Sequence, residues 1–108
     1  MKLLAIVRSA ALILAGCSIL IPPAKASNVE QGRRLARVHC ARCHAIDKVS
    51  PSPLAIAPPF RTLHKRYPVE TLQEALAEGI VTGHPAMPEF RFEPDQINDF
   101  LLFLKTLE

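Results

Sequence analysis

The sequence predicts a small all-α domain of about three helices that are joined by proline-rich loops. Apolar residues recur at helical spacing in three separate segments, and no segment shows a convincing strand-like alternation of apolar and polar residues. The loops between these segments contain most of the ten prolines. With 108 residues, the chain forms one domain at most.

The first predicted helix runs from about Val29 to His39. Asn28 is a suitable N-cap, and Gln31 follows it at the spacing of a capping box. The next segment, from Ala45 to Pro59, has four prolines and little periodicity, so it is predicted to be a loop. A short helical turn is expected from Phe60 to Lys65. The face of the first helix that would be packed carries Val29, Gly32, Leu35 and Ala36.

Two further helices complete the expected domain. Pro68 suits the first position of the second helix, and Gly79 suits its end. After a second loop at residues 81–93, Pro94 opens the last helix. Such a small domain with such long loops usually needs a metal or a cofactor as additional support. The apolar positions of the two helices are Val69, Leu72, Ala75 and Leu76, and Ile97, Phe100, Leu101 and Leu104.

Residues 1–26 have the features of a cleaved export signal. Basic residues stand near the start, and an uncharged apolar run extends from Ser9 to Ile21. This run is shorter than the roughly 20 residues that span a bilayer. Residues 24–26, Ala-Lys-Ala, fit a small-x-small cleavage site. We therefore expect a signal peptide at 1–26, a mature domain at 27–108 and a periplasmic location.

A second signal overlaps this leader. Residues 14–17, Leu-Ala-Gly-Cys, resemble a bacterial lipobox, so a membrane-anchored lipoprotein with its lipid on Cys17 is the alternative. Apolar residues follow Cys17 where a polar spacer is more usual, which favours cleavage after Ala26.

The charges of the expected mature domain are balanced but unevenly distributed. Residues 27–108 contain 10 basic and 10 acidic residues. Up to Arg66 there are 8 basic and 2 acidic residues, and from Tyr67 onward there are 2 basic and 8 acidic ones. This asymmetry suits the orientation of the molecule during encounter with a partner. Nucleic-acid binding is disfavoured, because the domain has neither net positive charge nor a recognition motif.

The strongest chemical signal is the C-x-x-C-H motif at residues 40–44. Cysteines at this spacing can bind zinc, form a redox disulfide or hold a haem covalently. A structural zinc site needs a second ligand pair, and a thioredoxin-like site needs a βαβ context; the sequence offers neither. C-x-x-C-H is the attachment signature of c-type haem. The motif therefore predicts one covalent haem c, with thioethers at Cys40 and Cys43 and with His44 as an axial ligand of the iron.

The second axial ligand is predicted to be Met87, the single methionine besides Met1. Met87 lies in a loop and is followed directly by Pro88, whereas a core methionine is expected on a helical face. A thioether in a rigid loop suits a weak iron ligand. His84, three residues earlier, is the rival ligand.

The residues named so far resemble class I monohaem cytochromes c of bacteria, and the resemblance extends over nearly all of residues 31–107. It implies a small cytochrome c fold wrapped around one haem. It also implies that Gly32 lies where the first and last helices cross, with Phe103 as its aromatic partner. The carbonyl group of Pro58 is expected to accept a hydrogen bond from the axial histidine.

With that resemblance, His44 and Met87 would fill both axial positions, which implies one-electron transfer and no enzymatic activity. Phe60, Arg61 and Tyr67 are expected in the haem environment. Arg61 and Tyr67, with His64, are candidates for contacts with the haem propionates. Candidates for the apolar wall are Phe60, Leu72, Leu76, Ile80, Phe90 and Leu101.

We expect a monomer that carries electrons between periplasmic redox partners. A basic rim around the motif would steer an acidic partner face onto the haem edge, at rates that fall as salt rises. Three alternatives remain: a dedicated cytochrome subunit of a periplasmic or membrane-bound oxidoreductase, a haem sensor or peroxidase with a labile sixth ligand, and a zinc-binding or thiol-redox module. The basic residues considered are Arg37, Arg42, Lys48, Lys65 and Arg66.

Overall fold

The computed structural model describes residues 16–21, 28–80 and 86–108, and these residues form helices and loops without a strand. The all-α class predicted from the sequence is therefore confirmed. None of the described helices is both long and apolar enough to cross a membrane. The elements, in chain order, are α1 (Asn28–His39), η1 (Phe60–Lys65), η2 (Val69–Thr71), α2 (Leu72–Glu78) and α3 (Pro94–Lys105), where η marks a 3₁₀ helix.

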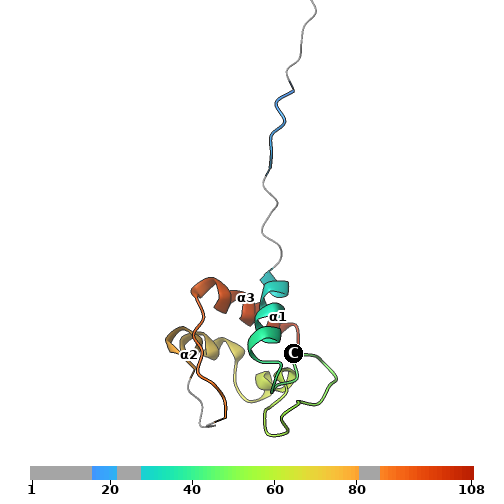
Figure 1. Cartoon of the computed structure of the whole chain (residues 1–108), viewed down its shortest axis with the longest axis vertical. Coiled ribbons are helices and arrows are strands. Elements are labelled where there is room, and N and C mark those ends of the chain that lie inside the picture. Colours follow the sequence, from blue (N-terminus) through green and yellow to red (C-terminus); the bar gives the residue numbers. More distant parts are fainter. Residues whose placement is uncertain (1–15, 22–27, 81–85) are drawn as a thin grey trace, which may run out of the picture.

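Helices α1 and α3 form the main packing contact of the domain, and they cross next to each other in Figure 1. The crossing is close because Gly32 is buried in it. A Cβ atom at this position would collide with the carbonyl oxygen of Asp99 and would lie 2.7 Å from the Cβ of Phe103. Arg33, one residue further along, places its guanidinium 5.6 Å from the centre of the Phe103 ring. Gly32 and Phe103 thus meet at the crossing of the first and last helices.

The middle of the chain forms a helical turn and an interrupted helix. The turn at Phe60–Lys65 is confirmed as the 3₁₀ helix η1. The predicted second helix is divided into η2 and α2. It begins as a 3₁₀ turn because the backbone N–H and the hydroxyl of Thr71 both donate to the carbonyl of Pro68, at 3.0 and 2.8 Å. Gly79 ends α2 with a φ of 107°, a value that side chains with a Cβ rarely adopt.

Helix α3 begins at Pro94, as the sequence predicted, and a capping box that the sequence analysis did not anticipate precedes it. The side chain of Glu93 accepts from the N–H of Gln96, and the side chain of Gln96 accepts from the N–H of Glu93 at 2.9 Å. At the other end of α3, Lys105 forms an ion pair with Glu70 of η2. Helix α1 includes Asn28 as its first residue. The sequence predicted Asn28 as the N-cap and a start at about Val29, so the helix begins one residue earlier than expected.

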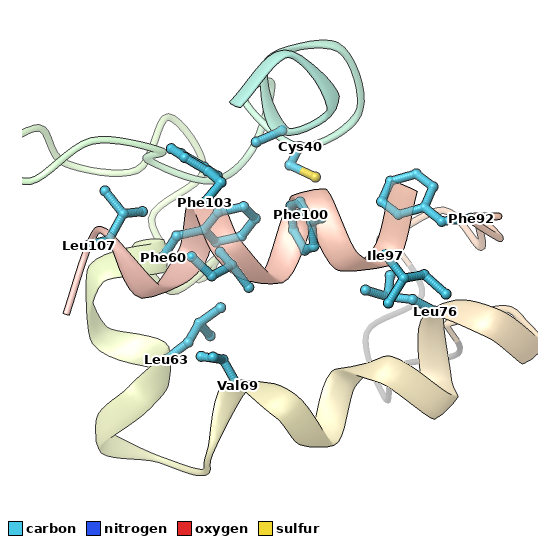
Figure 2. Close-up of a cluster of buried hydrophobic side chains, with 12 residues drawn as sticks. Cys40, Phe60, Leu63, Val69, Leu76, Phe92, Ile97, Phe100, Phe103 and Leu107 are labelled. Carbon is cyan, nitrogen blue, oxygen red and sulfur yellow. The ribbon is translucent and has the colours of Figure 1, made fainter. Parts of the chain in front are cut away.

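The core lies on both sides of α3, as Figure 2 shows. The last turn of α1 and Cys40 lie above α3 in this view, and η1, η2 and α2 lie below it. Phe103, Leu104 and Val69 are the largest side chains that are fully buried. Because α3 supplies apolar residues to both sides, it connects the end of α1 with the middle segments of the chain. The other buried members of this core include Phe60, Leu63, Leu76, Phe92, Ile97 and Phe100.

Candidate functional site

The C-x-x-C-H motif forms a tight turn directly after α1. The N–H of Cys40 donates to the carbonyl of Ala36 at 2.8 Å, which continues the helical pattern. The N–H groups of Cys43 and His44 both donate to the carbonyl of Cys40, at 3.1 and 2.9 Å. This winding brings the side chains of Cys40, Cys43 and His44 to one cavity.

Both cysteines of the motif are free thiols in the structure. Cys40 is buried, and this burial raises the pKa of its thiol to about 12, because the thiolate would lose its hydration. Cys43 is half-buried. Within the described part of the chain, no cluster of three or more His, Cys, Asp or Glu side chains could hold a metal ion.

The imidazole of His44 is held in one orientation by two neighbours. Its Nδ1 lies 2.8 Å from the carbonyl oxygen of Pro58, and its ring centre lies 4.9 Å from that of Phe60. A carbonyl oxygen can only accept, so Nδ1 carries the proton and Nε2 is left with a free lone pair. This is the arrangement of a histidine that ligates a metal through Nε2.

The loop that supplies Pro58 is attached to the motif at several points. The N–H of Phe60 donates to the carbonyl of Ala45 at 2.9 Å, and the N–H of Leu54 donates to the carbonyl of Cys43 at 3.1 Å. The hydroxyl of Ser52 accepts from the N–H of Ala45 at 3.0 Å. These bonds hold Pro58 beside the ring of His44.

Two adjoining cavities open beside the motif, with volumes of about 290 and 400 Å³. Met87 is half-buried and lines both of them, as His44 does. The structure therefore brings the two predicted axial ligands to the same hollow space. His84, the rival ligand, lies outside the described residues. The side chains shared by the two cavities are those of Cys40, His44, Ile56, Pro58, Met87 and Phe90.

The segment that carries Met87 is bonded to α2 and to the chain that follows it. The N–H of Ile80 donates to the carbonyl of Phe90 at 3.0 Å, and the N–H of Phe92 donates to the carbonyl of Leu76 at 2.9 Å. The guanidinium of Arg91 adds a bond of 2.8 Å to the carbonyl of Glu78. Residues 90–92 are thus bonded to α2 and Ile80, and Ala86, Met87 and Pro88, which precede them, line the first cavity.

The second cavity is lined mainly by apolar side chains. Of the six predicted wall residues, Leu101 does not line it and instead packs against the core from α3. Leu63, Phe92 and Phe100 line it although the sequence analysis did not assign them to the wall. Phe100 belongs to the apolar stripe predicted for α3, and the centre of its ring lies 5.9 Å from that of Phe60, at an edge-to-face angle of 82°. The predicted residues that do line it are Phe60, Leu72, Leu76, Ile80 and Phe90.

The polar residues near the cavities are arranged differently from the expectation. Tyr67 lines the second cavity, and burial raises the pKa of its hydroxyl. Arg66 lines the same cavity, whereas Arg61 lines neither cavity. The guanidinium of Arg61 donates to the carbonyl of Ser50 at 2.7 Å and is taken up by the 47–50 loop. His64 lines neither cavity, and its buried Nδ1 has no partner among the described residues.

This donor set fits a covalently bound haem. Two thiols, one oriented imidazole nitrogen and one thioether face an apolar hollow that the side chains leave open. Thiols can form thioether bonds to the porphyrin, and imidazole nitrogen and thioether sulfur are both axial ligands of haem iron. Cys40 and Cys43 would hold the group, and His44 and Met87 would face its iron.

A comparison with protein families agrees with this chemistry. A family model described as "Cytochrome c" matches residues 29–108, which include all the helices of the described residues except Asn28, the first residue of α1. Neither the curated proteins nor the solved structures gave a match to the chain.

Proposed function

Because the chain belongs to the cytochrome c family, whose members bind haem c and its iron covalently, we propose that it transfers single electrons through a haem ligated by His44 and Met87. Haem-based electron transfer is the general activity of this family. One observation carries the proposal of the two ligands: His44 and Met87 both line both of the adjoining cavities. We further propose that the protein resembles the class I, monohaem, bacterial type within the family.

Each residue of the site has a distinct task in this proposal. The haem supplies the chemistry, since its iron exchanges one electron between the ferrous and ferric states. Cys40 and Cys43 hold the group covalently, and Pro58 keeps the Nε2 of His44 aimed at the iron. The sulfur of Met87 favours the ferrous state and raises the reduction potential relative to a second histidine. If His44 and Met87 both ligated the iron, no coordination position would remain for a substrate, and we therefore propose that the protein is not an enzyme.

The Met87→Ala variant tests this proposal. We expect a lower reduction potential, loss of the weak far-red absorption of ferric thioether ligation, and ready binding of carbon monoxide by the ferrous protein. The control is Glu89→Gln, an exposed change in the same segment. A Met87→Ala protein with unaltered ferric spectrum and potential would remove Met87 as a ligand. Ready binding of carbon monoxide by the unmodified protein would favour the haem sensor or peroxidase instead.

For the redox partner, we propose an acidic docking face. Arg42 is exposed and lines the first cavity beside Cys43, and Arg37 and Lys48 are also exposed. Arg42→Gln is expected to slow electron transfer with an acidic partner and to weaken its dependence on ionic strength. Arg34→Gln, which removes the same charge from an arginine that lines neither cavity, is the control. Equal effects of the two variants would argue against docking at the cavity mouth.

A second candidate function, a cytochrome subunit within an oxidoreductase complex, is favoured by exposed apolar residues on the loop after the motif. Val49 is 85% exposed and Ile56 is 70% exposed, and Ile56 lines both cavities. Such side chains near a site are typical of a protein interface. Co-purification with a stable partner would support the subunit, whereas a monomer in sedimentation would support the free carrier.

The location of the protein is likewise a proposal. We propose a signal peptide at 1–26, a cytochrome domain at 27–108 and a periplasmic location, on the strength of the charge pattern, the apolar run and the small-x-small site. The alternative is a lipid anchor on Cys17. Mass spectrometry of the mature N-terminus separates the two, since one product begins at Ser27 and the other at a lipidated Cys17.

A further inference from the structure

His39, the last residue of α1, connects this helix to the segment that carries Met87. The centre of its ring lies 5.8 Å from that of Phe90 and 5.4 Å from that of Phe92. Phe90 and Phe92 in turn stack on each other at 6.1 Å, with an angle of 10° between their planes. These separations are those of attractive aromatic pairs. The three rings therefore form one cluster that joins α1 to residues 86–92.

Two rings of the cluster, those of His39 and Phe90, line the first cavity together with Met87. Hydrogen bonds fix the segment on its other side, toward α2, through Ile80 and Leu76. The aromatic cluster supplies a contact to α1, the helix that ends at the haem-binding motif. Phe90 lies only three residues after Met87, and both line the first cavity.

The ring of His39 is not required by the core, because His39 is an exposed residue. Its neighbour Val38 is also exposed, at 76%, and lines neither cavity. The difference between these two exposed positions is the contact that His39 makes with Phe90 and Phe92.

From this arrangement we propose that His39 is a positioning residue, whose ring holds Phe90, and with it Met87, against the end of α1. The inference rests on the proposed ligation by Met87. A ring at position 39 would keep the segment closed against external ligands that compete for the iron. Without it, the segment would open more often, and a small competitor such as imidazole would enter more easily.

The experiment compares His39→Ala, His39→Phe and Val38→Ala in the haem-loaded protein. In His39→Ala, which loses the ring contacts with both Phe90 and Phe92, we expect the apparent affinity of the ferric protein for imidazole to rise at least threefold to tenfold, roughly the range for one aromatic pair. The amide hydrogen of Ile80, which is bonded to Phe90, is expected to exchange faster by a similar factor. His39→Phe, which keeps an aromatic ring, and Val38→Ala are expected to remain close to the unmodified protein.

Two results would overturn the inference: unaltered imidazole affinity and Ile80 exchange in His39→Ala, or a His39→Phe protein that behaves like His39→Ala. The far-red absorption of ferric thioether ligation tests the ligand separately. If the unmodified protein lacks this absorption, the proposed ligation by Met87 is wrong. The Ile80 exchange rates then still decide whether the ring of His39 holds the segment.

Discussion

At the scale of single residues, the orientation of His44 comes from a bond to the backbone and not from another side chain. The carbonyl of Pro58 faces Nδ1 at 2.8 Å, and Phe60 packs against the ring. A proline at this position has no N–H to satisfy and a fixed φ, so the loop presents its carbonyl with little freedom. The backbone of this loop and the ring of Phe60 therefore set the orientation of the His44 imidazole.

Asp47 has a similar local role, in the loop after the motif. Its carboxylate accepts hydrogen bonds from Ser50 at 2.6 Å and from Val49 at 2.9 Å. The bonds to Ser50, then the bond to Val49, and finally the charge of Arg61 hold its pKa at about 2, below the ordinary 3.8. These bonds therefore hold the 47–50 loop in its turn, and Arg61 donates to the carbonyl of Ser50 in the same loop.

The titration of Asp47 gives a testable pH dependence. A carboxylate with a lowered pKa in the folded state stabilises the fold above its unfolded pKa, and this contribution is lost as pH falls from about 4 through about 2. We expect the amide NMR signals of Val49 and Ser50 to shift with a midpoint near pH 2. Asp47→Asn should abolish that titration. A midpoint near 3.8 would show that the two bonds do not form in solution.

At the scale of elements, the domain depends on how closely α1 approaches α3. Gly32 lets the two backbones meet, because even one methyl group would collide with the carbonyl of Asp99. The approach also sets the direction in which the end of α1, and hence the motif, points toward the cavities.

Gly32→Ala is expected to destabilise the haem-loaded protein by about 2 kcal/mol. Overpacking usually costs about 1–3 kcal/mol, and the cost here lies at the upper end because the colliding atom belongs to the backbone of Asp99. Alanine favours a helix over glycine by about 1 kcal/mol, which offsets only part of this cost. The midpoint of guanidinium unfolding measures the change. Gln31→Ala, an exposed substitution one residue earlier in α1, should be nearly neutral. Equal stability of Gly32→Ala and the unmodified protein would mean that the helices do not pack this closely.

The elements that the sequence predicted well are those whose signal is local. Helical spacing, Pro94 and Gly79 are read from neighbouring residues, and α1, η1 and α3 form close to the expected bounds. The division of the second helix into η2 and α2 was not predicted, because it depends on the hydrogen bonds of Thr71 to Pro68. The capping box of Glu93 and Gln96 has a sequence signal, but glutamate is an unusual N-cap.

In the candidate site, too, the residues that the sequence predicted well are those with a local sequence signal. The C-x-x-C-H motif and the lone loop methionine are local patterns, and they led to residues that line the same cavities. Arg61 lies in η1, and Arg66 directly follows this helix. Which of the two reaches a cavity depends on the direction in which each side chain leaves the backbone. That direction follows from the packing of η1 against α3, which no spacing in the sequence encodes.

At the scale of the whole molecule, the apolar side chains are arranged around an open space. The second cavity is lined by apolar residues of several elements: Phe60 and Leu63 of η1, Leu76 of α2, Phe92 just before α3, and Phe100 of α3. The same residues form much of the core in Figure 2. The domain thus has a core that its own side chains leave incomplete.

This incompleteness predicts that the chain does not fold stably without its haem. In the haem-free chain the apolar side chains around this hollow of about 400 Å³ would face water, and the burial that they lose counts against a total stability of only about 5–15 kcal/mol for a typical domain. The double variant Cys40→Ser, Cys43→Ser, which cannot form thioethers, should therefore show weak helical circular dichroism and no cooperative thermal transition. Val38→Ala is the control, because Val38 is exposed, precedes the motif closely and lines neither cavity. A haem-free double variant that unfolds cooperatively would show that the side chains can close the space by themselves, and the haem would then be a bound group rather than part of the core.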